Sequence, residues 1–223
     1  MNNIANQCGL WGLLALLFVM GMMSPSAQAK SATFEQTFNA KGEPASLHYQ
    51  AVFTSKGAEH TLEAWRDGDS RVKRSVDDAI ELYAFHPRSG AEFQLSILDK
   101  KRHIHSQVDR TNLYRIGNFT DWFDLAYSLK YPKQVYELSK VVAPREVVKP
   151  IQACSWYALR QDKQTTDICW SRTLRLPLLI QVADGSVVWR VTIVERKPIL
   201  DSVFVIHDQG FVQNDVNQDI DMD

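Results

Sequence analysis

The feature that most constrains the fold is an alternation of apolar and polar residues that recurs from residue 46 onward. In "SLHYQAVFT", Leu47, Tyr49, Ala51 and Phe53 share one face, which indicates a strand with one buried face. "AEFQLSILD", "LRLPLLIQV" and "SVVWRVTIV" repeat the pattern, and turn sequences such as "DGD" and "ADG" separate neighbouring strands. About ten or eleven strands with short connections predict an antiparallel sheet, because parallel neighbours require long crossovers.

The expected fold is therefore mainly β: one curved antiparallel sheet that forms a half-open barrel, since a sheet of this length tends to curl. One segment departs from the alternation. The apolar residues of "DWFDLAYSLKYP" recur at helical spacing and predict an amphipathic helix over residues 121–130. Thr120 or Asn118 is its expected N-cap, and Pro132 ends it. This helix is expected to plug the concave face, and its candidate lid residues are Trp122, Phe123, Leu125 and Leu129.

The first 29 residues are typical of an export signal. An apolar run from Leu10 to Met23 is followed by Ala27-Gln28-Ala29, a small-x-small cleavage pattern. The run is shorter than the roughly 20 residues that a spanning helix needs, although no Lys or Arg precedes it. We expect cleavage after Ala29 and a periplasmic protein; the alternative is an uncleaved anchor helix.

The rest of the chain fits one domain, residues 30–208, by its length. Residues 209–223 form a polar and acidic tail that we expect to be disordered. The 25 Lys and Arg nearly balance the 26 Asp and Glu, so the net charge does not indicate a nucleic-acid partner. No nucleophile elbow, phosphate loop, dinucleotide fingerprint or zincin helix occurs. We therefore expect neither an enzyme nor a cofactor.

Two histidines form a weak candidate for a metal site. His103 and His105 are alternate residues of a predicted strand, so both imidazoles could point the same way. A zinc site needs a third and usually a fourth ligand, and none follows from the spacing. Two polar residues on a solvated face explain the pattern better. A metal-binding accessory protein stays an alternative function.

The cysteines Cys154 and Cys169 are the two that survive removal of the signal. Their spacing is not that of a Cys-x-x-Cys redox pair, and no partner ligands for a metal lie nearby. An even number of cysteines in an exported chain favours a structural disulfide. If "SWYALRQ" and "TDICWS" are the arms of a hairpin, the disulfide lies on one face and the apolar residues of both arms on the other.

The later strands are apolar on both faces, which indicates that both faces are covered. One cover is the predicted helix, and the other is either a bound apolar ligand or a filled core; composition favours neither. If a ligand cavity exists, its candidate lining is Tyr157, Leu159, Ile168, Trp170, Leu176, Leu178, Trp189 and Val191.

Two segments carry a resemblance to a known group. "LEAWRDGDSRVKR" resembles the early hairpin of the periplasmic lipoprotein-carrier superfamily, which includes the LolA, LolB and RseB types. "ICWSRTLRLPLLIQVADGSVVWRVTI" is similar to the later strand, Leu-Pro, strand, Gly-turn and strand of that group. The resemblance implies a monomeric, non-enzymatic carrier of a lipid, a lipidated protein or another apolar ligand, with a membrane-bound partner. It also implies an arginine near the cavity mouth, Arg66 or Arg71. The alternative is the same scaffold used as a periplasmic interaction or sensor domain without a small ligand.

Overall fold

The computed structural model describes residues 33–87, 92–109, 121–144 and 148–215. The predicted signal peptide, residues 1–29, lies outside them. The described strands are β1 (Ser46–Ser55), β2 (Ala58–Asp67), β3 (Arg71–Val76), β4 (Ile80–Phe85), β5 (Gln94–Asp99), β6 (Ile104–Asp109), β7 (Tyr136–Val141), β8 (Ser155–Gln161), β9 (Gln164–Ser171), β10 (Leu176–Val182), β11 (Val187–Glu195) and β12 (Val212–Asp215). The helices are α1 (Phe34–Thr37), α3 (Trp122–Tyr127) and the 3₁₀ helix η1 (Asp201–Phe204).

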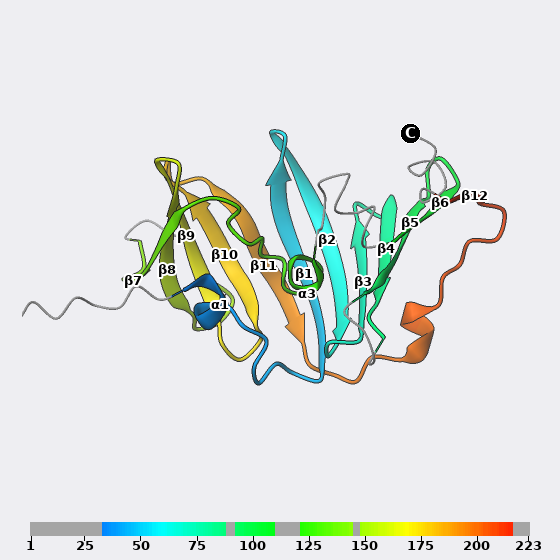
Figure 1. The fold of residues 1–223 in the computed structure, drawn as a ribbon, viewed down its shortest axis with the longest axis horizontal. Coiled ribbons are helices and arrows are strands. Elements are labelled where there is room, and N and C mark those ends of the chain that lie inside the picture. Colours follow the sequence, from blue (N-terminus) through cyan, green and yellow to red (C-terminus); the bar gives the residue numbers. More distant parts are fainter. Residues whose placement is uncertain (1–32, 88–91, 110–120, 145–147, 216–223) are drawn as a thin grey trace, which may run out of the picture. The chain divides into compact units, whose positions relative to one another are not determined.

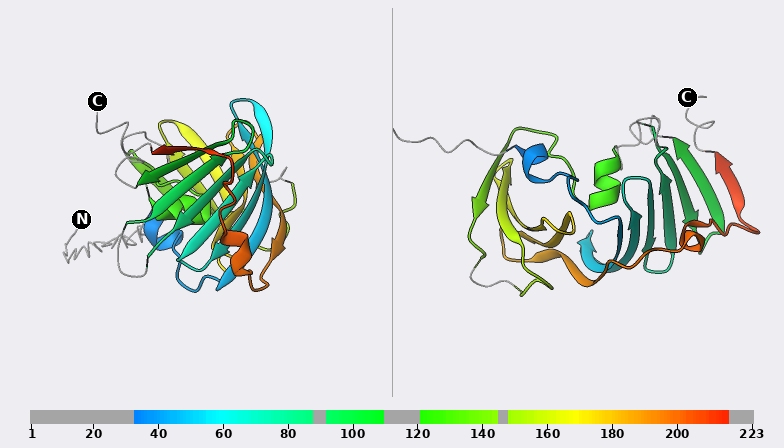
Figure 2. Two further views of the ribbon diagram at one scale, coloured as in Figure 1. Left: turned by 90° about the vertical axis from the view of Figure 1, so that its right-hand side faces the viewer. Right: turned by 90° about the horizontal axis from the view of Figure 1, so that it is seen from below.

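All twelve described strands form one sheet in the order β12-β6-β5-β4-β3-β2-β1-β11-β10-β9-β8-β7. Two meanders, β1–β6 and β7–β11, are joined where β1 pairs with β11 in antiparallel fashion. Figure 1 shows this order across the sheet, and the right-hand view of Figure 2 shows that the sheet curves without closing into a barrel. The predicted fold class, a curved and mainly antiparallel sheet with a small helix, is confirmed.

The predicted disorder of the tail is wrong for its first part, because Val212–Asp215 form β12 against β6. This pair is parallel, whereas every strand was expected to be antiparallel. The chain reaches β6 through a long connection that contains η1, and a connection of that length permits parallel pairing. Val212 N donates to His103 O at 2.8 Å, and His105 Nδ1 lies 2.8 Å from Asp208 Oδ2. The prediction of disorder rested on composition alone. Composition does not show that β6 has an unpaired edge with which the tail can form backbone hydrogen bonds. Residues 216–223 lie outside the described residues.

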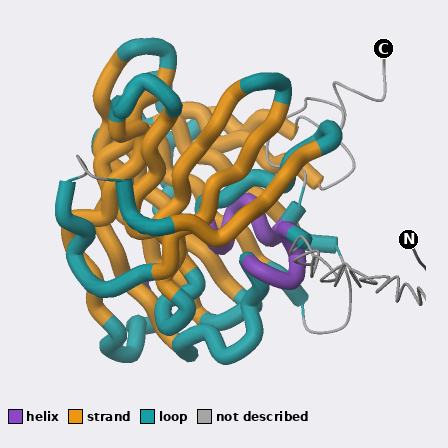
Figure 3. The backbone as a smooth tube through the Cα atoms, turned by 90° about the vertical axis from the view of Figure 1, so that its left-hand side faces the viewer, coloured by secondary structure: helices purple, strands orange, loops and turns teal. Residues whose placement is uncertain are grey.

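Helices α1 and α3 lie on the concave side of the sheet (Figures 2 and 3). Helix α3 is shorter than predicted, because Ser128 adopts a left-handed conformation with φ 55° and ends it. Its N-cap is Asp121, which accepts a hydrogen bond from Asp124 N at 3.0 Å and meets one of the unsatisfied amides of a helix start. The expected caps Thr120 and Asn118 lie outside the described residues.

Helix α1 has only four residues, yet its segment supplies much of the core. Phe34 and Phe38 are fully buried, and they are four residues apart, so one helical turn presents both to the sheet. Phe38 lies edge-on to Tyr157 at 5.3 Å and to Trp170 at 5.1 Å between ring centroids. A four-residue helix is not stable by itself, so packing of the two phenylalanines against the sheet stabilises α1.

The Cys154–Cys169 disulfide is present, as predicted, with a Cα–Cα distance of 5.4 Å. Trp156 is the neighbour of Cys169 across the β8–β9 hairpin, and Tyr157 is the neighbour of Ile168. Because successive side chains point to opposite faces, the disulfide and the Tyr157–Ile168 pair lie on opposite faces of the sheet, as the sequence indicated.

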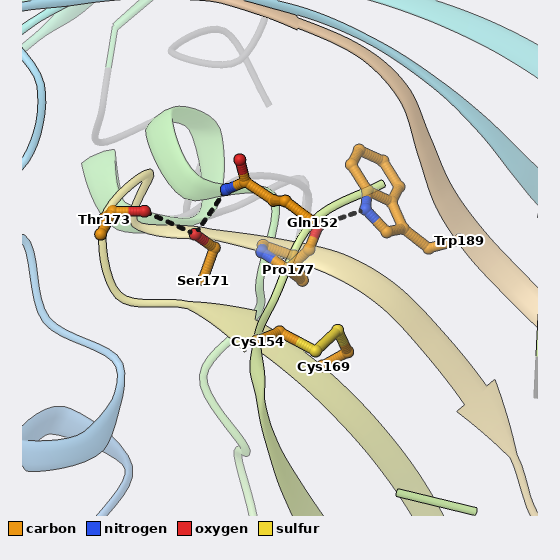
Figure 4. The surroundings of a disulfide bond; sticks show 7 residues. All are labelled: Gln152, Cys154, Cys169, Ser171, Thr173, Pro177 and Trp189. Atoms are coloured by element: carbon orange, nitrogen blue, oxygen red, sulfur yellow. Dashed lines mark hydrogen bonds between the residues drawn. A yellow bond between two sulfur atoms is a disulfide. The ribbon is translucent and has the colours of Figure 1, made fainter. Parts of the chain in front are cut away.

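The segment that enters β8 is held to the sheet beside the disulfide. Gln152 Nε2 donates to Ser171 Oγ at 3.1 Å, and Ser171 Oγ also lies 3.2 Å from Thr173 Oγ1 (Figure 4). Nearby, Trp189 Nε1 donates to Pro177 O at 2.8 Å. The disulfide therefore belongs to a set of contacts that fix the start of β8 against β9 and β10.

Removing the disulfide should lower stability without changing the fold. We expect the Cys154→Ser/Cys169→Ser variant to lose about 3 kcal/mol of unfolding free energy, because the closed loop no longer restricts the unfolded chain. Urea unfolding measures this loss. Reductant should destabilise the wild type by a similar amount and leave the variant unchanged. A variant as stable as the oxidised wild type would contradict a structural role.

Candidate apolar ligand site

The concave face carries an apolar hollow of about 380 Å³ beside the end of α3. The strand register explains why apolar side chains meet there: Leu62 pairs with Val76, Val76 with Ile80, and Leu82 with Ile97, so these side chains share one face. A volume of this size falls at the small end of the range of about 300–1,000 Å³ for small-molecule sites. The lining is Phe53, Leu62, Arg74, Val76, Ile80, Leu82, Ile97, Ser128, Lys130 and Trp189.

Arg74 is the buried charge of this wall, with an exposed fraction of 8%. Its Nη2 donates to Ser128 Oγ at 2.7 Å and, more weakly, to Asp124 O at 3.4 Å. Its Nε is buried without a hydrogen-bond partner, and Arg74 forms no ion pair with a carboxylate in the described parts of the chain. The Asp124 carboxylate interacts with Arg74 electrostatically but is not paired with it directly, and a guanidinium in largely apolar surroundings is costly without a directly paired counter-charge. An anionic group in the hollow would therefore be stabilised by Arg74.

Ser128 connects the end of α3 to this site. Its Oγ lies 2.8 Å from Tyr49 OH in addition to the bond from Arg74. These bonds offset the cost of a left-handed conformation at a residue other than glycine. The same residue thus ends α3, ties it to β1 and β3, and forms part of the wall of the hollow.

The arginines expected at a cavity mouth, Arg66 and Arg71, do not line the hollow. Arg66 is 1% exposed and donates to the carbonyls of Ala126 at 2.9 Å and Leu174 at 2.7 Å. Burial lowers the pKa of its guanidinium from the ordinary value. Arg71 pairs with Asp67 and, at 2.8 Å, with Asp201. Both have intramolecular partners, so the expectation of a mouth arginine at these two positions is wrong.

Arg74 is the residue that the sequence reasoning missed. It lies between Val72 and Val76 at a period of two, so alternation places it on the apolar face of β3. A cation on an otherwise apolar face was the signal available in the sequence. Arg71, by the same rule, belongs to the opposite face.

Most of the predicted cavity lining is core. Tyr157, Ile168 and Trp170 are buried beneath α1, and Leu159 is partly buried against the same cluster. The prediction of a ligand cavity here is wrong because the ring of Phe38 packs against Tyr157 and Trp170, where a ligand was expected. The residues Leu176, Leu178 and Val191 are buried in the second core cluster, and of the eight predicted residues only Trp189 lines the hollow.

The predicted lid residues are docked on the sheet. Leu125 and Leu129 are buried, and Trp122 and Phe123 are partly buried against the same cluster. Trp122 lies 5.9 Å from Phe93 between ring centroids. Helix α3 therefore covers part of the concave face. None of its own residues lines the hollow, but Ser128 and Lys130, just after its end, do.

The two histidines are not brought together. His103 lies in a turn with φ 56°, and its ring is 5.2 Å from that of Phe211, whereas His105 is buried beside Asp208. The described residues contain no group of three His, Cys, Asp or Glu side chains that could hold a metal ion. The premise that both imidazoles share one face is wrong, because His103 precedes the strand.

Asp124 is a titratable residue of α3 whose backbone carbonyl accepts from Arg74. The residue is 8% exposed, and its carboxylate accepts a hydrogen bond from Tyr131 N at 3.3 Å. Desolvation by burial raises its pKa from the ordinary value of 3.8 to about 6, with the negative charge of Asp121 acting in the same direction. The folded protein thus holds this proton more tightly than the unfolded chain does.

Comparisons with known proteins do not assign the chain to a family. The chain matches no protein-family model and no curated protein sequence. Two crystal structures of PNGF-II overlap with 79% of the chain at 12% and 13% identity and TM-scores of 0.42 and 0.32. The overlap spans 32% of the PNGF-II chain. Within the described segments, every helix is too short or too polar to cross a bilayer.

The raised pKa of Asp124 predicts a specific pH dependence. Its contribution to stability is complete below about pH 4 and is lost as the pH rises through about 6. Asp124→Asn removes the charge and keeps an oxygen that can accept from Tyr131 N. We therefore expect this variant to be more stable than the wild type at pH 7.5, on the order of 2 kcal/mol, and to lose that advantage near pH 4.

Urea unfolding at both pH values measures the effect. Asp78→Asn, which neutralises an exposed carboxyl in the turn after β3, is the matched control and should leave the pH profile of the wild type intact. An Asp124→Asn variant that is equally destabilised at both pH values would contradict the assignment.

Proposed function

We propose that the protein is a non-enzymatic binder of an amphipathic ligand that has an acyl-like apolar part and one anionic end. The observation that carries this proposal is the hollow on the concave face, whose walls are apolar except for Arg74, Ser128 and Lys130. Each methylene transferred from water into such a site contributes about 0.8 kcal/mol. The anionic end would bind the free N–H groups of Arg74, a charge-assisted interaction.

The volume of the hollow favours one apolar chain over several. At about 380 Å³ it is smaller than a site for several acyl chains would be, so a free lipid or one chain of a lipidated protein is the better match. A larger ligand would require α3 to move, because Leu125 and Leu129 fill the adjacent space. We therefore propose that α3 acts as a lid only if the ligand is larger than the hollow.

Two features support a periplasmic location for this function. The Cys154–Cys169 disulfide is of a kind that persists in oxidising compartments and is rare in the cytosol. The predicted signal peptide and its cleavage after Ala29 agree with this. We accordingly propose the periplasm, and the resemblance to the lipoprotein-carrier superfamily leads to the same compartment.

A second candidate is a domain that binds another protein. Strand β7 is one end of the described sheet, and Val135 and Val142 beside it are 92% and 89% exposed. An open strand edge can accept a strand of a partner. This function needs no ligand in the hollow, so ligand-binding measurements separate the two candidates.

Direct binding of a lipid analogue tests the leading proposal. We expect dansyl-labelled undecanoic acid to bind the wild type and to gain fluorescence in the apolar site. Arg74→Met should weaken its binding about tenfold or more, since hydrogen bonds to charged groups contribute roughly 1.5–3 kcal/mol. The uncharged methyl ester of the probe should bind both proteins similarly. Arg190→Met, an exposed position of β11, is the matched control.

A second pair of variants tests the location. Ile97→Trp places a larger side chain in the hollow and should abolish binding, whereas Ile193→Trp changes a residue of β11 that is 43% exposed and should not. Thermal unfolding establishes that both variants fold. A wild type that binds neither probe, or binding that Ile97→Trp leaves unchanged, would refute the site and favour the interaction domain.

A further inference from the structure

A second hollow, of about 510 Å³, lies between α1, β7 and the β9–β10 turn, and its charged side chains are all cations. Its lining is Gln36, Thr37, Asn39, Lys41, Lys140, Tyr157, Arg172 and Arg175. The four cations come from three separate parts of the chain, so the fold and not a local run of basic residues concentrates the charge. The apolar hollow has a different lining throughout.

The four cations lack acidic partners in the described part of the chain. Lys41, Lys140, Arg172 and Arg175 form no ion pair with any carboxylate among the residues that the structure describes. This differs from the surrounding surface, where Arg71, for example, is paired with acidic residues. Like charges held close together raise the local positive potential and attract anions.

The two guanidinium groups are oriented by neutral acceptors. Arg172 Nη2 donates to Tyr157 OH at 3.3 Å, and Arg175 Nη2 donates to Lys41 O. Neither acceptor carries a formal charge, so these two hydrogen bonds leave the positive charge of both arginines uncompensated. Arg175 Nε is in addition buried without a hydrogen-bond partner, and an unsatisfied buried donor is costly.

The backbone around Arg175 is also fixed. Arg175 adopts a left-handed conformation with φ 51°, and its N–H donates to Ser171 O at 2.8 Å. Its carbonyl accepts from Arg66 Nη1 at 3.2 Å. A pre-oriented guanidinium loses little conformational entropy on binding a planar or tetrahedral oxyanion.

From these observations we infer that the hollow is a binding site for a polyvalent oxyanion of the phosphate type. Guanidinium groups bind phosphate oxygens through paired charge-assisted hydrogen bonds, and the two lysines supply further charge. Four cations in a space of this size match an anion with more than one charged group. The same chemistry is offered by free phosphate compounds and by the headgroups of anionic phospholipids. This inference does not rest on the proposed lipid site.

Calorimetric titration of the full chain with inorganic pyrophosphate at low ionic strength tests the site. We expect the wild type to bind and the Lys140→Gln/Arg172→Gln variant to bind at least about tenfold more weakly. The matched control, Arg102→Gln/Lys197→Gln, removes the same charge from positions whose side chains are 78% and 79% exposed and should bind as the wild type does. The Lys140→Arg/Arg172→Lys variant retains the charge and should recover much of the affinity.

Vesicle co-sedimentation distinguishes the two sources of the anion. If the source is a headgroup, phosphatidylglycerol vesicles capture the wild type and the control but not the Lys140→Gln/Arg172→Gln variant, and phosphatidylcholine vesicles capture none. If the source is a free compound, pyrophosphate binds and the vesicles do not. The inference is overturned if neither probe binds, or if the control loses as much affinity as the variant of the hollow. Melting temperatures of all variants establish that they fold.

Discussion

The buried guanidinium of Arg66 is the interaction on which the arrangement of the concave face depends. It donates to the carbonyls of Ala126, Leu174 and Arg175 and lies over the ring of Tyr127 at 4.5 Å. Its Nε lies 3.5 Å from Glu43 Oε2. One side chain of β2 thus joins the end of α3, the β9–β10 turn and the segment after α1. Buried carbonyl groups need donors, and Arg66 supplies them to parts of the chain that have no strand partner there.

Both candidate sites are adjacent to this junction. On one side, the bond to Ala126 holds the end of α3, and Ser128, two residues later, orients Arg74 at the apolar hollow. On the other side, the bond to the carbonyl of Arg175 fixes the backbone of the basic hollow. Arg66 differs from Arg74 and Arg175 in its interaction partners. Arg66 donates to three carbonyls and forms an ion pair with Glu43, whereas Arg74 and Arg175 have no carboxylate at ion-pair distance among the described residues. The Nε of all three arginines is buried without a hydrogen-bond partner.

The sequence predicted those features that depend on local periodicity and on pairs of residues. Alternation in the strands, the helix that contains Leu125 and the Cys154–Cys169 pair follow from patterns within about twenty residues, which is the range over which spacing determines neighbours. The face of the β8–β9 hairpin also followed, because register alone determines which side chains oppose Cys169.

The features that were not predicted depend on contacts between distant segments. Burial of Phe38 depends on Tyr157 and Trp170, more than a hundred residues away, so the short segment by itself gave no sign that α1 would fill the expected cavity. Strand β12 likewise depends on the open edge of β6. Alternation places Arg66 and Arg74 on the apolar face and Arg71 on the opposite face, but the different partners of these arginines arise only in the folded sheet.

The planar guanidinium also explains why an arginine, rather than another cation, occupies position 66. Three carbonyl oxygens from separate segments accept from Nη1 and Nη2, and the fixed fork of an arginine presents these donors in one plane. A lysine has three donors on a single nitrogen and cannot span the same acceptors. One rigid group therefore helps to set the positions of α3 and of the β9–β10 turn. Ser128 after α3 lines the apolar hollow and Arg175 in the turn lines the basic hollow, so the walls of both hollows depend on Arg66.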